Sequence, residues 1–339
     1  MHRDGTRRSH RGLGPALVSV VLAASACASA VSDTAPQTTP APTTLTPATD
    51  RGSSTVTAED IDETTTGLRG AIAAGLWPGD PTHPYEGLRR YRGEVVIDEE
   101  WLAAENGGSR LVEGIEVDGN LVVLAPGVTL RYCHVVGDAD ANYAVQANRE
   151  DGDARDLEIS WCEIDHANHG GKALLVRSGV LHRLDVAGGE DGIHVNDAGP
   201  PGSLLISETY VHDQFRPPEH HSDAVQFNGD PGGPVTIIRS KLINHFRDAN
   251  APLMLSDVGE IEVVDNYLWG GVYFVVGGVA GHLEFRDNRL GWKSTEFGAF
   301  GVSEGAVRYE HNTWAPWIDP ESIGPDGEPV VLRGPDPLS

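Results

Sequence analysis

From residue 128 to residue 314 the chain repeats a short pattern of apolar and polar positions. Apolar residues alternate with others, a small or polar residue follows, and an apolar residue closes the segment, as in LEISWCEI (157–164) and IEVVDNYL (261–268). The pattern recurs every 22–31 residues. Period-two alternation in short runs predicts β-strands, and helical spacing is absent through this region.

A second short strand is expected roughly midway through each repeat, as in YAVQAN, KALLVR, DGIHVN, DAVQFN and NAPLML. Turns rich in Gly, Asp, Asn and Pro separate these strands. No single unit of this kind can bury its apolar face, so stacked units must make the core together. The sequence therefore predicts an all-β chain folded as a parallel β-helix of about eight to nine coils.

The small-or-polar position of the repeat holds Asn266, Asn288 and Asn312 in successive units, where stacked amides can form a ladder. By its repeats and these asparagines, the stretch 93–314 resembles the right-handed parallel β-helix (pectate-lyase-like) superfamily. The resemblance implies right-handed coils and a carbohydrate-active protein. Cys133 and Cys162 occupy the same position in neighbouring coils, where a disulfide or two buried thiols both fit.

The first 27 residues combine a basic start with an apolar run that ends at Cys27, which is typical of a signal peptide. Ala24-Ser25-Ala26-Cys27 resembles a bacterial lipoprotein signal, which implies that Cys27 is lipidated; ordinary cleavage near Ala30 is the alternative. Residues 28–56 are rich in Thr, Pro and Ala and read as a disordered tether. We expect an extracellular protein, lipid-anchored to the cell membrane or secreted.

Around the predicted β-helix we expect two smaller segments. Residues 57–92 would form an N-terminal cap that opens with a short helix at Thr57, and residues 315–339 a C-terminal tail. The formal charge of −25 repels nucleic acid, and we expect membrane contact only through the lipid anchor. The predicted protein is a monomer whose partner is a polysaccharide.

Candidate chemistry follows from aligning the mid-coil strands. Their third and fifth residues are mostly apolar and point inward, so the fourth and sixth face outward. The fourth residues are Gln146, Leu175, His194, Gln226 and Leu253. The sixth include Asn148, Arg177, Asn196 and Asn228. Rows of amides suit sugar hydroxyls because an amide both donates and accepts hydrogen bonds.

Loops bring further basic residues to this predicted patch. The insertion HDQFRPPEHHSD (212–223) contains two of the candidate histidines. The predicted catalytic residues are Lys172, Arg177, Asp191, His194, His212, His221 and Asp223. The predicted substrate-binding residues are Gln146, Asn148, Asn196, Gln226, Asn228, Lys241 and His245. A structural reading also stands, because Asp at a strand entrance can cap a turn.

This patch favours a polysaccharide lyase that cleaves an acidic polysaccharide by β-elimination. Elimination needs a base, such as a histidine or a lysine of lowered pKa, and a group that neutralises the uronate carboxylate, such as Arg177 or Ca²⁺. Asp191 and Asp223 are the candidate Ca²⁺ ligands; no other cofactor is expected. The alternatives are a non-catalytic glycan-binding or cell-surface module, and a glycoside hydrolase or uronate epimerase of the same fold.

Overall fold

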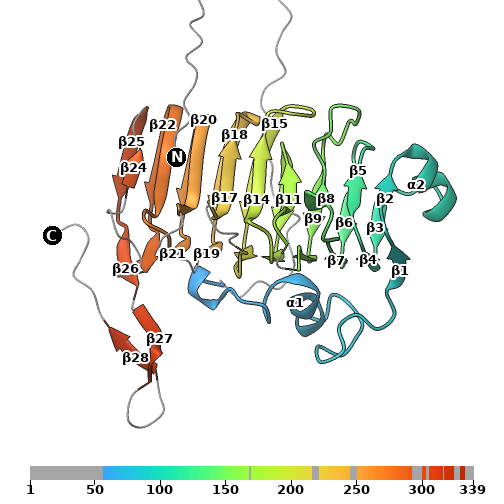
Figure 1. Cartoon of the computed structure of the whole chain (residues 1–339), viewed down its shortest axis with the longest axis horizontal. Helices are drawn as coiled ribbons and strands as arrows, with labels where there is room; N and C mark the ends of the chain where they lie inside the picture. Colours follow the sequence, from blue (N-terminus) through green and yellow to red (C-terminus); the bar gives the residue numbers. More distant parts are fainter. Residues whose placement is uncertain are drawn as a thin grey trace, which may run out of the picture. The chain divides into compact units, whose positions relative to one another are not determined.

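The computed structural model describes residues 56–167, 169–215, 221–244, 250–291, 300–302, 305–315, 317–323 and 329–332. They form a parallel β-solenoid of about eight turns, which confirms the predicted fold class. Each strand lies against the equivalent strand of the preceding turn, so that successive turns stand side by side (Figure 1). Cys27 and the predicted signal and tether lie outside the described residues, apart from Val56.

One face of the solenoid is a ten-stranded sheet in which all neighbours are parallel. Its strands, in spatial order, are β1 (Arg89–Arg92), β4 (Ile115–Asp118), β7 (His134–Val136), β10 (Glu163–Asp165), β13 (Asp185–Ala187), β16 (Tyr210–Val211), β19 (Lys241–Asn244), β21 (Tyr267–Gly270), β23 (Arg289–Gly291) and β26 (Thr313–Ala315). We call it the ten-stranded sheet.

A sixteen-stranded sheet supplies the other two faces. One, the β8 arm, contains β2 (Val95–Ile97), β5 (Leu121–Val123), β8 (Tyr143–Gln146), β11 (Lys172–Val176), β14 (Asp191–Asn196) and β17 (Asp223–Asn228). The other, the β9 arm, contains β3 (Leu111–Glu113), β6 (Thr129–Arg131), β9 (Glu158–Ser160), β12 (Gly179–His182), β15 (Gly202–Ser207) and β18 (Gly232–Ile238).

The two arms meet in long strands that take part in both. Strand β20 (Ala251–Val264) pairs with β17 near its start and with β18 near its end. Strand β22 (Val275–Arg286) pairs with β20 on one side and with β24 (Phe300–Val302) and β25 (Ala306–Glu310) on the other. The chain therefore visits three faces in every turn, and residues close in sequence often lie on different faces.

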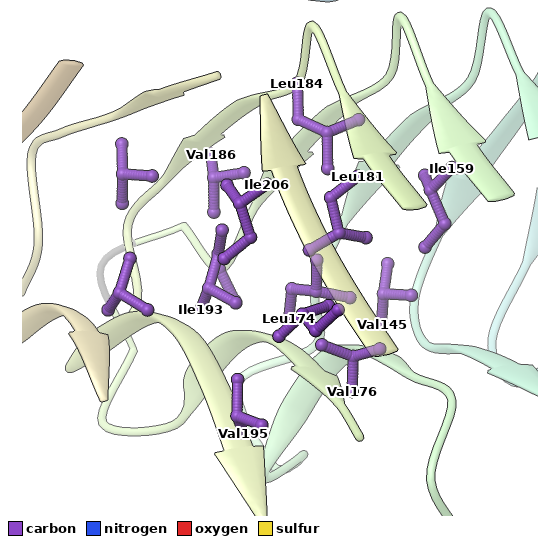
Figure 2. Packing of buried hydrophobic residues seen from close by; sticks show 14 of the residues in the cluster. Val145, Ile159, Leu174, Val176, Leu181, Leu184, Val186, Ile193, Val195 and Ile206 are labelled. Atoms are coloured by element: carbon purple, nitrogen blue, oxygen red, sulfur yellow. The ribbon is translucent and has the colours of Figure 1, made fainter. Parts of the chain in front are cut away.

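The core is a set of apolar columns that run through the stack. Val145, Leu174 and Ile193 lie in register on β8, β11 and β14, each at most 1% exposed. Figure 2 shows them inside the solenoid together with Leu181 and Ile206 of the β9 arm. Full burial of such a side chain stabilises the fold by about 1.5–3 kcal/mol. Repeated contacts of this kind hold neighbouring turns together.

The turn from the β9 arm to the ten-stranded sheet has the same backbone in successive coils. The residue that follows the β9-arm strand is left-handed, with φ between 46° and 57°, although none of these residues is glycine. They are Tyr132, Trp161, Arg183, Glu208, Arg239, Asp265, Asp287 and His311. A left-handed backbone conformation costs a residue other than glycine about 1–2 kcal/mol. Contacts of the next residue must therefore stabilise the turn.

That next residue forms the ladder predicted from the sequence. The Asn312 Oδ1 accepts from the Asn288 backbone N–H at 2.8 Å, and the Asn288 Oδ1 accepts from the Asn266 backbone N–H at 2.9 Å. The Asn266 Oδ1 continues the series by accepting from the Ser240 backbone N–H at 2.8 Å. All four residues are fully buried. The turns from Ser240 to Asn312 are thus tied to one another by buried side chains that replace water.

At the other end of the ladder, Cys133 and Cys162 form a disulfide between neighbouring coils. Their Cα atoms are 4.5 Å apart. The sequence left this pairing open against two free thiols, and the structure has the bridge.

The segment 57–92 lies along the ten-stranded sheet. It contains η1 (Ala58–Asp60), α1 (Gly67–Ala73) and β1. The Gly67 backbone N–H donates to the Arg183 carbonyl at 2.9 Å, and Glu59 pairs with Arg289 at 2.8 Å. Helix α2 (Glu99–Glu105) follows the first strand of the β8 arm and adds Leu102 to the core. In the predicted tail, β27 (Trp317–Ile323) and β28 (Pro329–Leu332) pair antiparallel.

Candidate functional site

The row predicted to face outward lies in register on the β8 arm, but two of its members, Leu175 and His194, are buried. Gln146, Leu175, His194 and Gln226 stand in register on four neighbouring strands. The row then departs from the expected one, because Gln226 pairs with Met254 and not with Leu253. Strand β20 is shifted by one residue relative to the alignment predicted from the sequence. Leu253 and Leu255 consequently point into the core in place of the expected Pro252 and Met254, and the Gln226 Nε2 lies 3.1 Å from the Met254 Sδ.

His194, in the middle of this row, is only 6% exposed. The Asn228 Nδ2 lies 3.1 Å from its Nε2 and donates to it, which leaves the proton of the neutral ring on Nδ1. The Nδ1 has no hydrogen-bond partner. Burial, assisted by the charge of Lys172, lowers the pKa of His194 to about 4. The ring is therefore neutral near pH 7, and its one acceptor nitrogen is occupied.

Lys172 lies at the start of β11 between two carboxylates. Its Nζ is 3.3 Å from the Glu190 Oε2 and 3.4 Å from the Asp191 Oδ2. Burial works against the charge on Lys172, but attraction to Asp191 and Glu190 outweighs it and raises the pKa of the ammonium. The predicted base with a lowered pKa is therefore not found here, because Lys172 is an ion-paired cation.

Asp191 and Asp223 occupy equivalent positions in neighbouring coils, as predicted. The Asp191 Oδ1 accepts from the Asp223 backbone N–H at 3.1 Å. The Asp223 Oδ1 accepts from the Ala251 backbone N–H at 3.0 Å, and its Oδ2 lies 3.3 Å from the Asn250 Nδ2. Both carboxyl groups are buried, which raises their pKa, to about 6 for Asp191. They join the starts of successive strands.

The same contacts bear on the predicted Ca²⁺ site. Lys172, the Asn250 amide and backbone N–H groups already use the oxygens of Asp191 and Asp223 that a cation would need. Within the part of the chain that the structure describes, no group of three or more His, Cys, Asp and Glu side chains is arranged to hold a metal ion.

An open cavity of about 420 Å³ lies over β8, β11 and β14. Three of the predicted substrate-binding residues line it. The loop 149–151, which was not among the predicted site residues, lines it as well. The lining residues are Tyr143, Gln146, Asn148, Arg149, Glu150, Asp151, Leu175, Asn196 and Ala198. Tyr143 lies opposite Lys172 on the neighbouring strand, and the charges of Lys172 and Asp191 both act on its phenol. Burial raises the pKa of Tyr143, so the phenol stays protonated.

The orientation of the amide of Asn148, a residue that lines this cavity, is fixed by its neighbours. The Asn196 Oδ1 accepts from the Ala198 backbone N–H at 3.0 Å, so the Asn148 group that contacts it must be the donor Nδ2. The Asn148 Oδ1 then points to the other side, where it has no hydrogen-bond partner although the residue is 1% exposed. A buried acceptor without a partner is unfavourable, so a ligand whose donor reached this oxygen would gain affinity.

The rim of the cavity carries more negative than positive charge. The Arg149 guanidinium binds Asp151 through two hydrogen bonds, of 2.8 and 2.6 Å. Glu150, between them, is exposed. No motif marked this loop in the sequence; only its position directly after the YAVQAN strand could have suggested it.

Several other predicted site residues lie elsewhere. Arg177 binds the backbone carbonyls of Asp197, Gly199 and Pro231, so it clamps a turn. His221 is exposed and lies two residues before Asp223. His245 lies outside the described residues.

Lys241 belongs to β19 of the ten-stranded sheet and His212 directly follows β16 of the same sheet, so neither lies on the β8 arm. The His212 Nε2 lies 2.7 Å from the Asp185 Oδ1 and its Nδ1 2.8 Å from the Asp213 Oδ2. Burial alone would lower the pKa of His212, but hydrogen bonds to the two carboxylates raise it to about 9. Lys241 lies over the Tyr210 ring and 3.4 Å from the Glu59 carbonyl, beneath the segment 57–92. The residues that were predicted to form one patch therefore lie in two separate clusters.

Comparisons with known proteins add no relative: no family model, no curated protein and no solved structure matches the chain. Among the described residues, no helix has both the length and the apolar character needed to cross a bilayer. The candidate function therefore rests on the cavity of the β8 arm.

Proposed function

We propose that this protein binds a polysaccharide in the cavity over β8, β11 and β14. The observation that carries the proposal is the combination of Gln146, Asn148 and Asn196 with the Tyr143 ring in one open cavity. Amides match the hydroxyl groups of a sugar, and an aromatic ring packs against its apolar C–H face. The cavity is open to solvent, so a polymer longer than the site can extend beyond it. The fold is in keeping with the pectate-lyase-like resemblance, which remains part of the proposal.

Binding without cleavage fits these residues better than β-elimination does. Elimination needs a base with a free lone pair next to the substrate. Lys172 is a paired cation, the acceptor nitrogen of His194 is occupied, and the phenol of Tyr143 is protonated. The acidic rim also repels a uronate polymer.

A lyase is the second candidate because Tyr143 lies next to the charge of Lys172. In that arrangement Tyr143, once deprotonated, would take the proton α to the uronate carboxylate and return it to the leaving oxygen, while the Lys172 cation would offset the charge of the carboxylate. Asp191 and His194 would then position these groups.

One experiment separates the two candidates. The full chain is incubated with a panel of uncharged, cationic and uronate polysaccharides, and binding is measured by affinity electrophoresis while absorbance of an unsaturated product is followed. We expect retardation without product, reduced about tenfold by Tyr143→Ala. Product formation on any uronate would favour the lyase. Absence of retardation on the whole panel would overturn binding.

The proposed location is the outer surface of the cell, with Cys27 lipidated. The Cys133–Cys162 disulfide supports export, because such bridges persist in oxidising compartments. Lipid labelling of the wild type but not of Cys27→Ala, with release of the variant into the medium, is the expected result. Labelling that survives the substitution would contradict it.

A further inference from the structure

The cavity combines acceptors and negative charge in a way that sugar hydroxyls alone do not require. Resting on the function proposed above, we infer that the ligand is a polysaccharide of amino sugars with free ammonium groups. An ammonium group carries three donors and a positive charge, and it has no acceptor to offer. The residues that line the cavity meet each of these properties.

The acceptor is the Asn148 Oδ1. Its orientation is set by the hydrogen bonds that Asn196 makes to Asn148 and to the Ala198 backbone, so the amide cannot turn to offer a donor. This oxygen is buried, has no partner and belongs to a residue that lines the cavity. Hydroxyl and ammonium groups can both donate to it, but hydrogen bonds from a charged donor are stronger.

The charge comes from the loop 149–151. Arg149 is held by both oxygens of Asp151, so the positive charge of this loop is neutralised where it lies. Glu150 is exposed, and among the residues that line the cavity its charge is the one left in excess. An ammonium group near Glu150 would be attracted, and a uronate carboxylate would be repelled.

Two further features act in the same direction. The face of the Tyr143 ring attracts cations through its quadrupole. The whole chain carries a formal charge of −25, which draws polycations toward the surface and repels polyanions. The cavity is open, so an ammonium group can keep part of its water and the desolvation cost stays small.

The test uses the full chain and four oligosaccharides of equal length: β-1,4-linked glucosamine, its N-acetylated form, the hydroxyl counterpart β-1,4-glucose, and a galacturonate oligomer. Tetralysine serves as a cation without sugar rings. Titration calorimetry at low and moderate salt measures each affinity. We expect the glucosamine oligomer to bind about tenfold more tightly than the hydroxyl counterpart, with a preference that declines with added salt.

The variants locate the effect. Glu150→Gln should lower affinity for the glucosamine oligomer about two- to fivefold and lower affinity for the hydroxyl counterpart by a smaller factor. The matched control is Glu94→Gln, which removes the same charge from an exposed residue outside the cavity. Asn148→Ala should lower affinity about tenfold, in a protein checked by thermal unfolding.

The outcomes are distinct. If the uncharged oligomers bind as tightly as glucosamine, the ammonium preference is wrong while glycan binding stands. Equal binding of tetralysine, or equal effects of Glu150→Gln and Glu94→Gln, would mean diffuse charge attraction and would also overturn the inference. If no oligosaccharide binds, the proposed function itself fails.

Discussion

Asp191 accepts a hydrogen bond from the backbone N–H of Asp223 at 3.1 Å, across two neighbouring coils. A carboxylate placed there joins strand starts in the way that the buried asparagines join the turns. The two residues that the sequence suggested for catalysis are thus part of the hydrogen bonding that holds neighbouring coils together.

Asp191→Ala should destabilise the fold by about 2–4 kcal/mol, because it leaves the Asp223 N–H unbonded and Lys172 with one carboxylate fewer. Asp191→Asn keeps an acceptor oxygen and should cost less. Urea unfolding measures both. If the two variants unfold like the wild type, Asp191 has no structural role.

Because of His212, the free energy of unfolding should fall as the pH becomes alkaline. The folded chain binds the imidazole proton more tightly, with a pKa of about 9, than the unfolded chain with a pKa near 6.5. Its stabilisation, about 2–3 kcal/mol, is complete below pH 6.5 and is lost as the pH rises through 9. Urea unfolding at several pH values should show this decline in the wild type and less of it in His212→Gln. The exposed His221→Gln is the control and should retain the wild-type slope.

The asparagine ladder should be intolerant of truncation. Asn288→Ala removes the acceptor of the Asn266 N–H and the donor to the Val263 carbonyl, both buried, and should cost about 2–4 kcal/mol. Asn142→Ala, at an exposed side chain, should cost less than about 0.5 kcal/mol. Thermal unfolding compares them, and similar losses in the two variants would contradict a special role for the ladder.

The disulfide should contribute measurably because it closes a loop between Cys133 and Cys162, 29 residues apart. Chain entropy predicts a loss of about 3–4 kcal/mol on reduction. Denaturant midpoints with and without a reductant test this. The double variant Cys133→Ala/Cys162→Ala is the control, and its midpoint should not respond to the reductant.

Much of the fold was predictable because each repeat contains the residue pattern that specifies its strands and its turn. Alternating apolar residues marked the strands, and Asn266, Asn288 and Asn312 marked one turn. The register that places Asp191 opposite Asp223 on neighbouring strands also followed from aligning the strands. The shift at β20 was missed, because NAPLML has apolar residues in adjacent positions and two alignments fit it equally well.

The site was less predictable than the fold. His212 lies near His194 in sequence, but the coil turns between them and carries His212 to the ten-stranded sheet. The direction of the Lys172 pKa depended on Glu190 and Asp191, whose distance from it only packing determines. The loop 149–151 has no motif, and its place at the cavity depends on the strands beneath it.

The left-handed turn recurs with the same backbone in successive coils, and from Ser240 to Asn312 a buried polar side chain follows it. Because each coil contacts only its neighbours, whole coils are the natural units of insertion and deletion. A shorter or longer relative can therefore arise by copying or losing one coil without redesigning the remainder. The length of the proposed glycan-binding surface would then grow or shrink by one coil at a time.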